Sequence, residues 1–319
     1  MNLSFDEAPH VPVLLADVVS CFEQCDDGYI IDCTLGFGGH SAALLKALPK
    51  IKIIACDQDE KALQFCKNRF KTELENGRIF IKKCNFSKLF YELDKNIKIA
   101  GILADIGVSS LQLDDDERGF SLSSHELDMR MDKSKEKNAK NVINEYSKSE
   151  LEKIFLDYGE LKMASKIADK IISARARKPV TSALELASII GGEKIKGRNV
   201  SIAKLAFQAI RIEVNDELGV LNELLDALEK IRPSGAKLAI IAFHSLEDRI
   251  IKERFRLWAK SCICDENAFK CSCGNDNALG KIITKKPLVP SSAEIKANPR
   301  SSCSKMRVFE FFKERKNGK

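Results

Sequence analysis

The chain has 319 residues, of which 44% are hydrophobic and 31% are charged, and its formal net charge is +6 at pH 7. This apolar fraction is ordinary for a globular protein, so the composition excludes a wholly disordered chain, and the length suggests about two domains. The mean hydropathy is −0.19, and no apolar run reaches the roughly 18 residues that a membrane-spanning helix requires.

The N-terminal segment, residues 1–13, contains Asp6 and Glu7 and lacks the basic and apolar regions of a secretory signal. The chain has 11 cysteines. Disulfide-rich secreted scaffolds are small, whereas this chain is long enough to bury a core of its own. We therefore expect a cytoplasmic protein with reduced cysteines.

Short apolar runs alternate with amphipathic stretches over the first hundred residues. The apolar runs have the character of buried strands and lie at residues 29–33, 51–56, 78–81 and 99–104. Residues 39–48 and the region around residues 62–70 have helical spacing instead. Strands that alternate with helices predict βαβ units, and therefore a parallel sheet with helices on both faces.

Helical patterns and polar loops, with no strand-like run, occupy the region from about residue 113 to residue 216. A long amphipathic helix is predicted over residues 217–231, and further strands over 237–243, 282–283 and 307–311. This order predicts an α/β fold, with a mostly parallel sheet and an inserted all-helical domain. We expect residues 1–113 and 216–319 to form the sheet domain and residues 114–215 to form the insertion.

Three glycines lie where the first predicted strand passes into the first helix, in residues 32–40 (DCTLGFGGH). Gly36 and Gly38 match the first two positions of the dinucleotide-binding fingerprint, but Ser41 stands at the third. Glycine lets a backbone turn sharply and lets a ligand approach the main chain closely. The run predicts a nucleotide-binding turn, and a tight turn without a ligand is the alternative.

Aspartates end three of the predicted strands, namely Asp32, Asp57 and Asp105. Because ligands of open α/β sheets bind beyond the carboxyl ends of the strands, we expect the three to converge on one crevice. Asp57 is placed to accept hydrogen bonds from both hydroxyls of a ribose. Asp32 favours a cationic ligand over a pyrophosphate. Phe86, just after the third strand, is a candidate to hold an adenine, with a core position as its alternative.

These residue types fit S-adenosylmethionine better than a nicotinamide dinucleotide. S-adenosylmethionine has a ribose, an ammonium and a sulfonium and no phosphate, so a carboxylate at the glycine turn is compatible with it. The residues therefore favour a methyltransferase. An NAD-dependent oxidoreductase, which would share the glycine turn and Asp57, is the alternative.

Several runs resemble the MraW family of ribosomal small-subunit RNA methyltransferases, also called methyltransferase H. They are residues 32–41 (DCTLGFGGHS), 105–114 (DIGVSSLQLD), 118–121 (RGFS), 127–132 (LDMRMD), 207–215 (FQAIRIEVN), 243–248 (FHSLED) and 298–300 (NPR). The resemblance implies a class I, Rossmann-like S-adenosylmethionine-dependent methyltransferase fold with a helical insertion. It also implies methylation of the exocyclic N4 of one decoding-centre (P-site) cytidine in 16S rRNA, with the small ribosomal subunit as partner and no membrane.

Carried over residue by residue, the resemblance places cofactor contacts at Gly38, Gly39, His40, Asp57, Phe86, Asp105 and Gln112. The chain departs from the family at Cys33, where a small Gly or Ala is expected. A DNA cytosine-N4 methyltransferase is a further alternative. Those enzymes carry a Ser/Asp-Pro-Pro-Tyr loop where this chain has residues 105–108 (DIGV).

Cytosine N4 is a poor nucleophile because its lone pair is delocalised into the ring. Its methylation requires alignment with the methyl group and a hydrogen-bond acceptor for the amine. Asp105, or a neighbouring main-chain carbonyl, is the candidate acceptor. The base must also be presented outside a stack, and Phe120 and Phe243 are candidate stacking platforms, with burial in the core as their alternative.

His244 is a candidate for the cytidine pocket or for a core histidine. The neighbouring Ser245 lacks the G-x-S-x-G frame of a hydrolase nucleophile. We expect Ser245 to cap a helix instead, with Asp248 three positions later.

Three basic clusters are candidate phosphate contacts, and each is alternatively a solvated face. They are Arg175, Arg177 and Lys178; residues 194–198 (KIKGR); and Arg249, Lys252, Arg254 and Arg256. The insertion is where recognition of a large substrate is expected, because a small-molecule methyltransferase has no need of it.

Two C-x-C pairs, Cys262 with Cys264 and Cys271 with Cys273, lie close together in the sequence. Four thiolates suit a tetrahedral structural zinc. A disulfide and four free thiols are the alternatives. The sequence leaves the oligomeric state open.

Overall fold

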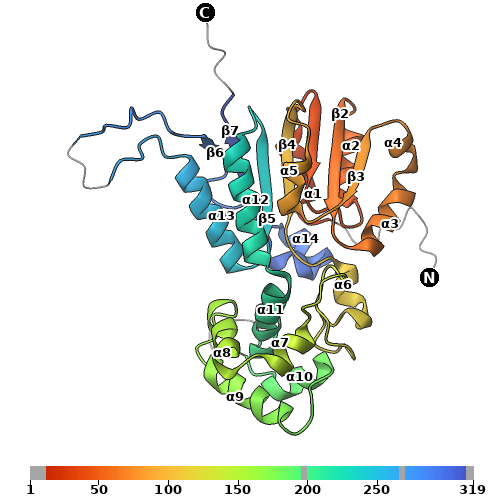
Figure 1. The fold of residues 1–319 in the computed structure, drawn as a ribbon. Helices are drawn as coiled ribbons and strands as arrows, with labels where there is room; N and C mark the ends of the chain where they lie inside the picture. The colour runs from red at the N-terminus through yellow and green to blue at the C-terminus, as the bar shows by residue number, and fades with distance from the viewer. Residues whose placement is uncertain (1–11, 195–199, 266–269, 314–319) are drawn as a thin grey trace, which may run out of the picture. The chain divides into compact units, whose positions relative to one another are not determined.

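The computed structural model describes residues 12–194, 200–265 and 270–313. The chain divides into two compact units, one of Met1–Gly107 with Val220–Lys319 and the other of Val108–Gly219 (Figure 1). We call them the sheet unit and the helical unit. The inserted unit is wider than the predicted 114–215, by six residues at its start and four at its end.

A seven-stranded sheet forms the centre of the sheet unit, with the strand order β3-β2-β1-β4-β5-β7-β6. Strands β1 to β5 run parallel to one another, and β7 is antiparallel to both of its neighbours, β5 and β6. The strands are β1 (Gly28–Asp32), β2 (Ile51–Asp57), β3 (Ile79–Lys83), β4 (Ile99–Asp105), β5 (Lys237–Ala242), β6 (Gly280–Ile282) and β7 (Lys305–Phe311). The chain order reverses between β1 and β4, which makes their carboxyl ends the topological switch point, where open α/β sheets bind ligands.

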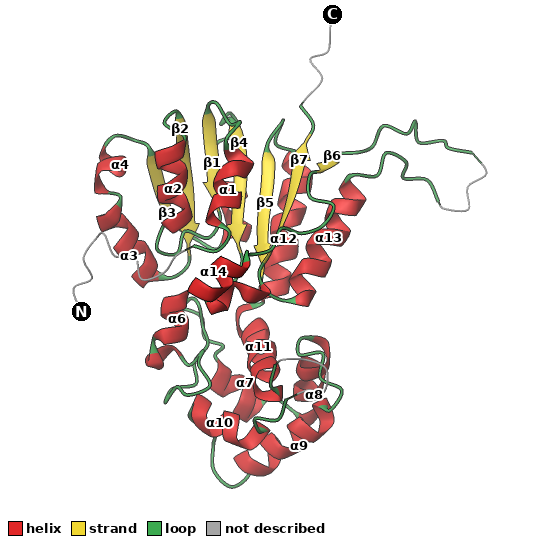
Figure 2. Cartoon of the chain, turned by 180° about the vertical axis from the view of Figure 1, so that it is seen from behind, coloured by secondary structure: helices red, strands yellow, loops and turns green. Residues whose placement is uncertain are grey.

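Helices cover both faces of this sheet (Figures 1 and 2). One face packs against α1 (Leu15–Phe22), α2 (Gly39–Ala47) and α3 (Glu60–Arg69), and the other against α5 (Phe86–Glu92), α12 (Glu217–Ile231) and α13 (Ser245–Trp258). The neighbours Ile30 and Ile31 in β1 are both fully buried, and they belong to opposite faces. Burial on both faces explains why these strands read as continuous apolar runs rather than alternating ones.

Shorter elements complete the sheet unit. They are α4 (Lys71–Glu75), α14 (Ser292–Ala297) and the 3-10 turn η2 (Pro299–Cys303). No helix in the described parts of the chain is both long and apolar enough to cross a bilayer.

The helical unit has a hydrophobic core of its own. Its elements are α6 (Ser110–Asp114), η1 (Asp116–Arg118), α7 (Ala139–Glu145), α8 (Lys148–Asp157), α9 (Ala164–Arg175), α10 (Ala183–Ile190) and α11 (Ile202–Asn215). The described part of this unit contains no strand beyond an isolated bridge between Lys194 and Ser201. This agrees with the helical insertion that the sequence predicts.

Three of the motif runs meet inside the helical unit through two buried polar side chains. Asn215 accepts a hydrogen bond from the Met131 N–H at 2.8 Å and donates one to the Met129 carbonyl at 2.8 Å. Arg118 donates to the carbonyls of Arg130 and Met131 at 2.9 and 3.0 Å. These bonds fasten the 127–132 segment to η1 and α11, so these motif residues have a structural role.

Candidate functional site

The glycine turn between β1 and α2 is held in a left-handed backbone conformation. Gly36 has φ +49° and Gly38 has φ +73°. A Cβ at Gly38 would lie 2.3 Å from the Phe70 ring, and one at Gly39 would lie 2.2 Å from the Pro12 ring, whereas a Cβ at Gly36 meets nothing within 4 Å. Gly38 and Gly39 are therefore required by packing within the protein, and Gly36 is the glycine whose bare side faces open space.

Asp32 fixes the shape of this turn. Its buried carboxylate accepts hydrogen bonds from the Ser41 hydroxyl at 2.6 Å and from the Thr34 N–H at 3.1 Å. Burial raises the pKa of Asp32, and the bond from Ser41 opposes that rise. Ser41, which stands where the dinucleotide-binding fingerprint has a glycine, is thus the hydrogen-bond partner of Asp32. The sequence assigned this carboxylate to a cationic ligand.

Asp57 connects the end of β2 to the same turn. Its carboxylate accepts from the Gly36 N–H at 2.8 Å and from the Asp59 N–H at 2.9 Å. Burial raises the pKa of Asp57 to about 6, against the lowering effect of these backbone N–H groups. A third backbone N–H, that of Gln58, also stabilises the carboxylate, and three bonds leave at least one of its roughly four acceptor sites open. This leaves Asp57 able to accept a hydrogen bond from a hydroxyl group of a ligand.

His40 and Asp105 leave buried polar atoms without hydrogen-bond partners at the carboxyl ends of β1 and β4. Among the described residues, no hydrogen-bond partner is found for either ring nitrogen of His40 or for Oδ1 of Asp105. Nε2 of His40 lies 3.5 Å from Oδ2 of Asp105. The Asp105 N–H donates to the Thr34 hydroxyl at 2.7 Å, which fixes the backbone here. An unpaired buried polar group costs about 1–3 kcal/mol, so these atoms fit a bound ligand that supplies donors and acceptors.

Two other predicted cofactor contacts lie outside this group. Phe86 is the first residue of α5 and is half-buried against the α5–α12–α13 face. Gln112 belongs to the helical unit, where its buried side chain accepts a hydrogen bond from the Ser109 N–H at 3.0 Å. The sheet unit therefore brings together Asp32, Gly36, His40, Asp57 and Asp105. The contacts of Phe86 and Gln112 with a cofactor stay predictions.

The two candidate stacking rings, Phe120 and Phe243, differ in burial. Phe120 is only 7% exposed and is part of the core of the helical unit, under the guanidinium of Arg118. This burial favours the core position that the sequence left as its alternative. Phe243 is partly buried and packs against Gly107, where an added Cβ would lie 2.8 Å from the ring.

The predicted cap of α13 is wrong by one residue. His244, not Ser245, is the N-cap, and it forms a capping box with Glu247. Glu247 accepts from the Phe243 N–H at 2.8 Å and the His244 N–H at 3.2 Å, while Asp248 pairs with Arg307 at 2.6 Å instead. An imidazole nitrogen accepts a backbone hydrogen bond as a hydroxyl does, which is why Ser/Thr-based signatures miss this cap.

Among the basic clusters, Arg175 is engaged inside the protein. Its guanidinium donates to the Ile143 and Tyr146 carbonyls, both at 2.6 Å, so it closes the C-terminal end of α7 rather than facing a phosphate. Arg177 and Lys178 are exposed. Of the run 194–198, all but Lys194 lies outside the described residues.

A cationic groove lies between α13 and the β6–β7 edge. It is a cavity of about 290 Å³ lined by Lys252, Phe255, Arg256, Ile282, Thr284, Lys285 and Arg307. Arg307 is neutralised by Asp248, and the nearby Arg254 pairs with Asp226 and Glu229. In the described parts of the chain, no ion pair involves Lys252, Arg256 or Lys285. These three cations give the groove its charge, and of the predicted cluster only Lys252 and Arg256 line it. The sequence offered no signal for Lys285.

The strand order is 3-2-1-4-5-7-6 with an antiparallel β7, a glycine turn follows β1, and carboxylates end β1, β2 and β4. Together these features define a class I, Rossmann-like methyltransferase of the S-adenosylmethionine-dependent type. Residues 7–312 match the MraW methylase family. The chain belongs to this family, and it is a methyltransferase, which excludes the oxidoreductase alternative.

Curated relatives match along almost the whole chain. The ribosomal RNA small subunit methyltransferase H of Campylobacter fetus subsp. fetus (strain 82-40) is 56% identical over 303 residues, which cover 95% of this chain and 98% of that protein. The protein of the same name from Campylobacter jejuni subsp. jejuni serotype O:23/36 (strain 81-176) is 53% identical over 305 residues, covering 96% and 98%. An rRNA methylase structure from Streptococcus thermophilus aligns at 10% identity and a TM-score of 0.40, over 95% of this chain and 99% of that one. That likeness is too weak to add to the strand order.

Proposed function

We propose that this methyltransferase transfers the methyl group of S-adenosylmethionine to the exocyclic N4 of a decoding-centre (P-site) cytidine in the 16S rRNA of the small ribosomal subunit. The relatives named above support small-subunit rRNA as the substrate, and the resemblance of the motif runs supports the N4 atom and its position. The structural observation that carries the proposal is the set of unpaired buried atoms on His40 and Asp105, at the same edge of the sheet at which β2 ends with Asp57. A reaction on ribosomes places the enzyme in the cytoplasm.

Each residue of the group has a role suited to its environment. When bound, S-adenosylmethionine supplies the methyl group of its sulfonium, and the rest of the donor leaves as a thioether. Asp57 accepts hydrogen bonds from ribose hydroxyls, and Asp32 keeps the glycine turn in the shape that leaves Gly36 open. His40 fills the space beside Asp105 and offers a donor and an acceptor to the ligand. Preorganised groups of this kind need no rearrangement at the moment of reaction, which is where much of their effect arises.

Asp105 is the residue that we assign to the chemistry. Its Oδ1 is buried and has no partner among the described residues, so it is available to accept a hydrogen bond from the N4 amine. This bond draws the amine toward tetrahedral geometry and localises its lone pair. As the N4–methyl bond forms and the sulfur–methyl bond breaks, N4 becomes cationic. Asp105 then accepts one N4 proton, which leaves neutral N4-methylcytidine.

The cationic groove is the proposed contact for the RNA backbone. Lys252, Arg256 and Lys285 line one cavity without neutralising partners in the described residues. Cations whose charge is not already compensated gain most from binding phosphates, because they release counterions from the nucleic acid.

Incubation with radiolabelled donor and small ribosomal subunits from a strain lacking this enzyme tests the proposal. We expect label in 16S rRNA only, recovered as N4-methylcytidine at a single decoding-centre position. Free 16S rRNA and double-stranded DNA serve as parallel substrates. Label on another atom or another nucleotide, or transfer to DNA in preference to the subunit, would overturn the assignment.

A further inference from the structure

The segment between Trp258 and Gly280 connects α13 to β6 and contains no helix or strand in its described residues, 259–265 and 270–279. None of these residues is buried, and Ile263 is 62% exposed. Loops of this length without secondary structure are uncommon in compact domains, and the described residues of this one bury no side chain in a hydrophobic core. A fixed conformation here requires another source of stability.

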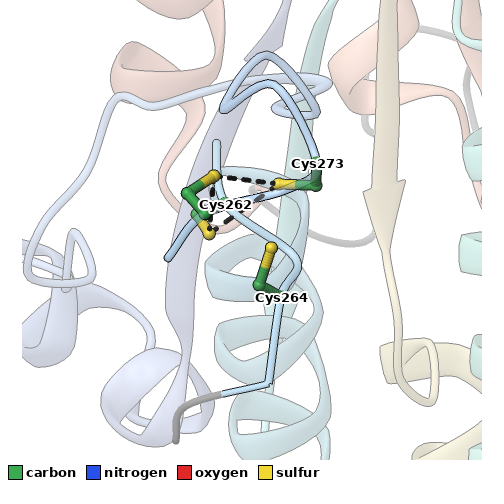
Figure 3. A group of neighbouring side chains, drawn as sticks. Cys262, Cys264 and Cys273 are labelled. Atoms are coloured by element: carbon green, nitrogen blue, oxygen red, sulfur yellow. Dashed lines mark hydrogen bonds between the residues drawn. The ribbon is translucent and has the colours of Figure 1, made fainter. Parts of the chain in front are cut away.

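Four cysteine sulfurs converge in this segment (Figure 3). The Sγ atoms of Cys262, Cys264, Cys271 and Cys273 all lie within 4.8 Å of one another. The distance is 3.7 Å between Cys262 and Cys271, 3.6 Å between Cys271 and Cys273, and 3.7 Å between Cys273 and Cys262. Figure 3 shows the sulfurs of Cys262, Cys264 and Cys273 directed into the same space.

These distances match a metal tetrahedron rather than a disulfide. A Zn–S bond of about 2.3 Å places the sulfurs of a regular tetrahedron about 3.8 Å apart. A disulfide requires about 2.05 Å between its sulfurs. Three of the sulfur separations are thus already those of bound zinc, and Cys264 completes the set from slightly farther away.

Backbone N–H groups are also arranged to stabilise thiolates here. The Ile263 N–H donates to Sγ of Cys273 at 3.4 Å, and the Ser272 N–H donates to Sγ of Cys264 at 3.3 Å. Second-shell donors of this kind orient the ligands of a metal and favour their deprotonated form.

We propose that Cys262, Cys264, Cys271 and Cys273 bind one Zn²⁺ in a closed tetrahedral site that holds the α13–β6 connection in its folded conformation. Four thiolates select zinc over magnesium or calcium, and four protein ligands leave no open position for catalysis. The bond from the Leu279 N–H to the Trp258 carbonyl, at 2.7 Å, and that from the Asn277 N–H to the Ser261 carbonyl, at 3.0 Å, close the base of the same loop. This inference does not depend on the proposed substrate.

Metal analysis of the full-length protein, purified without chelator, tests the site. We expect one zinc per chain, and after exchange with Co²⁺ the intense visible bands and sulfur-to-metal charge-transfer absorption of a tetrahedral thiolate complex. Cys271→Ser should lose the metal, whereas Cys303→Ser, which removes an exposed thiol outside the cluster, should keep it.

Two further measurements separate zinc loss from misfolding. Removal of zinc should increase proteolytic cleavage within residues 259–279 at least tenfold and leave the affinity for S-adenosylhomocysteine unchanged. Folded protein that contains no zinc even after incubation with Zn²⁺, iron in place of zinc, a disulfide within the cluster, or equal zinc in Cys271→Ser and the parent would each overturn the proposal.

Discussion

Asp105 differs from the other strand-end carboxylates in having an oxygen with no partner in the described structure. Both oxygens of Asp32 hold the glycine turn, and both oxygens of Asp57 accept backbone hydrogen bonds. Oδ1 of Asp105 is buried and unpaired. An oxygen that makes no structural bond can change its hydrogen bonding or its protonation during a reaction without disturbing the fold.

Asp105→Asn tests this assignment. The amide keeps the size of the side chain but cannot accept a proton, so we expect kcat at saturating donor and subunit to fall by about 10²- to 10⁴-fold. The matched control is Asp94→Asn, because Asp94 lies in an exposed turn. Its kcat should equal that of the parent. Full turnover by Asp105→Asn in the radiolabel assay would remove Asp105 from the chemistry.

Asp57 makes donor binding dependent on pH. Burial raises its pKa to about 6, and only the ionised carboxylate accepts hydrogen bonds from both ribose hydroxyls. Below pH 6 the ionised fraction falls about tenfold per pH unit, so the Kd for S-adenosylhomocysteine should rise by up to that factor. Between pH 7 and 8 this group should cause no change.

Isothermal titration calorimetry between pH 5 and 8 measures this dependence. Binding at pH 5.5 should release a proton, because hydroxyl donors lower the pKa of the bound carboxylate. Asp57→Asn should bind weakly, with a Kd that this site no longer makes pH-dependent. A parent Kd that stays constant from pH 7 to pH 5 would contradict the ribose contact.

At the residue scale, the sequence predicted which carboxylates end the strands but not the packing around the glycine turn. Strand-end aspartates and a glycine turn are local patterns, and the structure brings Asp32, Asp57 and Asp105 to one edge of the sheet as predicted. The rings that exclude a Cβ at Gly38 and Gly39 belong to Phe70 and Pro12, which lie far away in the sequence. Long-range packing of this kind has no signature in the local sequence.

At the scale of elements, helix α13 presents two different sets of charges. Arg254 faces α12 and pairs with Asp226 and Glu229, whereas Lys252 and Arg256 line the cationic groove. In the sequence these three residues belong, with Arg249, to one basic cluster. Helical geometry places residues four apart on the same face and separates them from the residue between them, so only one pair is available for phosphate.

The double variant Lys252→Gln/Arg256→Gln tests the groove. We expect it to weaken binding to the small ribosomal subunit, and to reduce the slope of log K against log salt by about 0.7–0.9 for each phosphate that the groove no longer neutralises. Arg254→Gln is the matched control on the same helix, and its salt slope should equal that of the parent. Filter binding at several salt concentrations gives the slopes. Equal slopes for the double variant and the parent would exclude the groove as an RNA-binding surface.

The sequence predicted the strands better than their arrangement. Five buried runs are strands β1 to β5 within one or two residues of the expected bounds. The β6 strand, predicted at residues 282–283, lies at Gly280–Ile282, and helix α1 was not predicted. An edge strand of three residues is too short to show a periodic pattern of apolar residues in the sequence. The order β5-β7-β6 and the antiparallel direction of β7 depend on pairing between distant segments, which hydrophobic periodicity does not specify.

For the molecule as a whole, the important feature is that the two units have separate hydrophobic cores. The core of the helical unit is formed by residues between Phe120 and Val214, and the two cores of the sheet unit flank the sheet. A segment that buries its own apolar residues can fold independently of the chain into which it is inserted.

We therefore expect residues 108–219 to fold as an isolated segment, with a helical circular dichroism spectrum and a cooperative thermal transition. Two leucines of α8 provide a matched pair, because Leu151 is 0% exposed and Leu156 is 57% exposed. Leu151→Ala should cost about 2–5 kcal/mol through the cavity it creates, whereas Leu156→Ala should change the free energy of unfolding by less than about 0.5 kcal/mol. At about 4–8 °C per kcal/mol for a domain of this size, the first variant should lower the Tm of the segment by at least about 8 °C. A segment that melts without cooperativity, or equal effects of the two substitutions, would show that the helical unit depends on the sheet unit for its core.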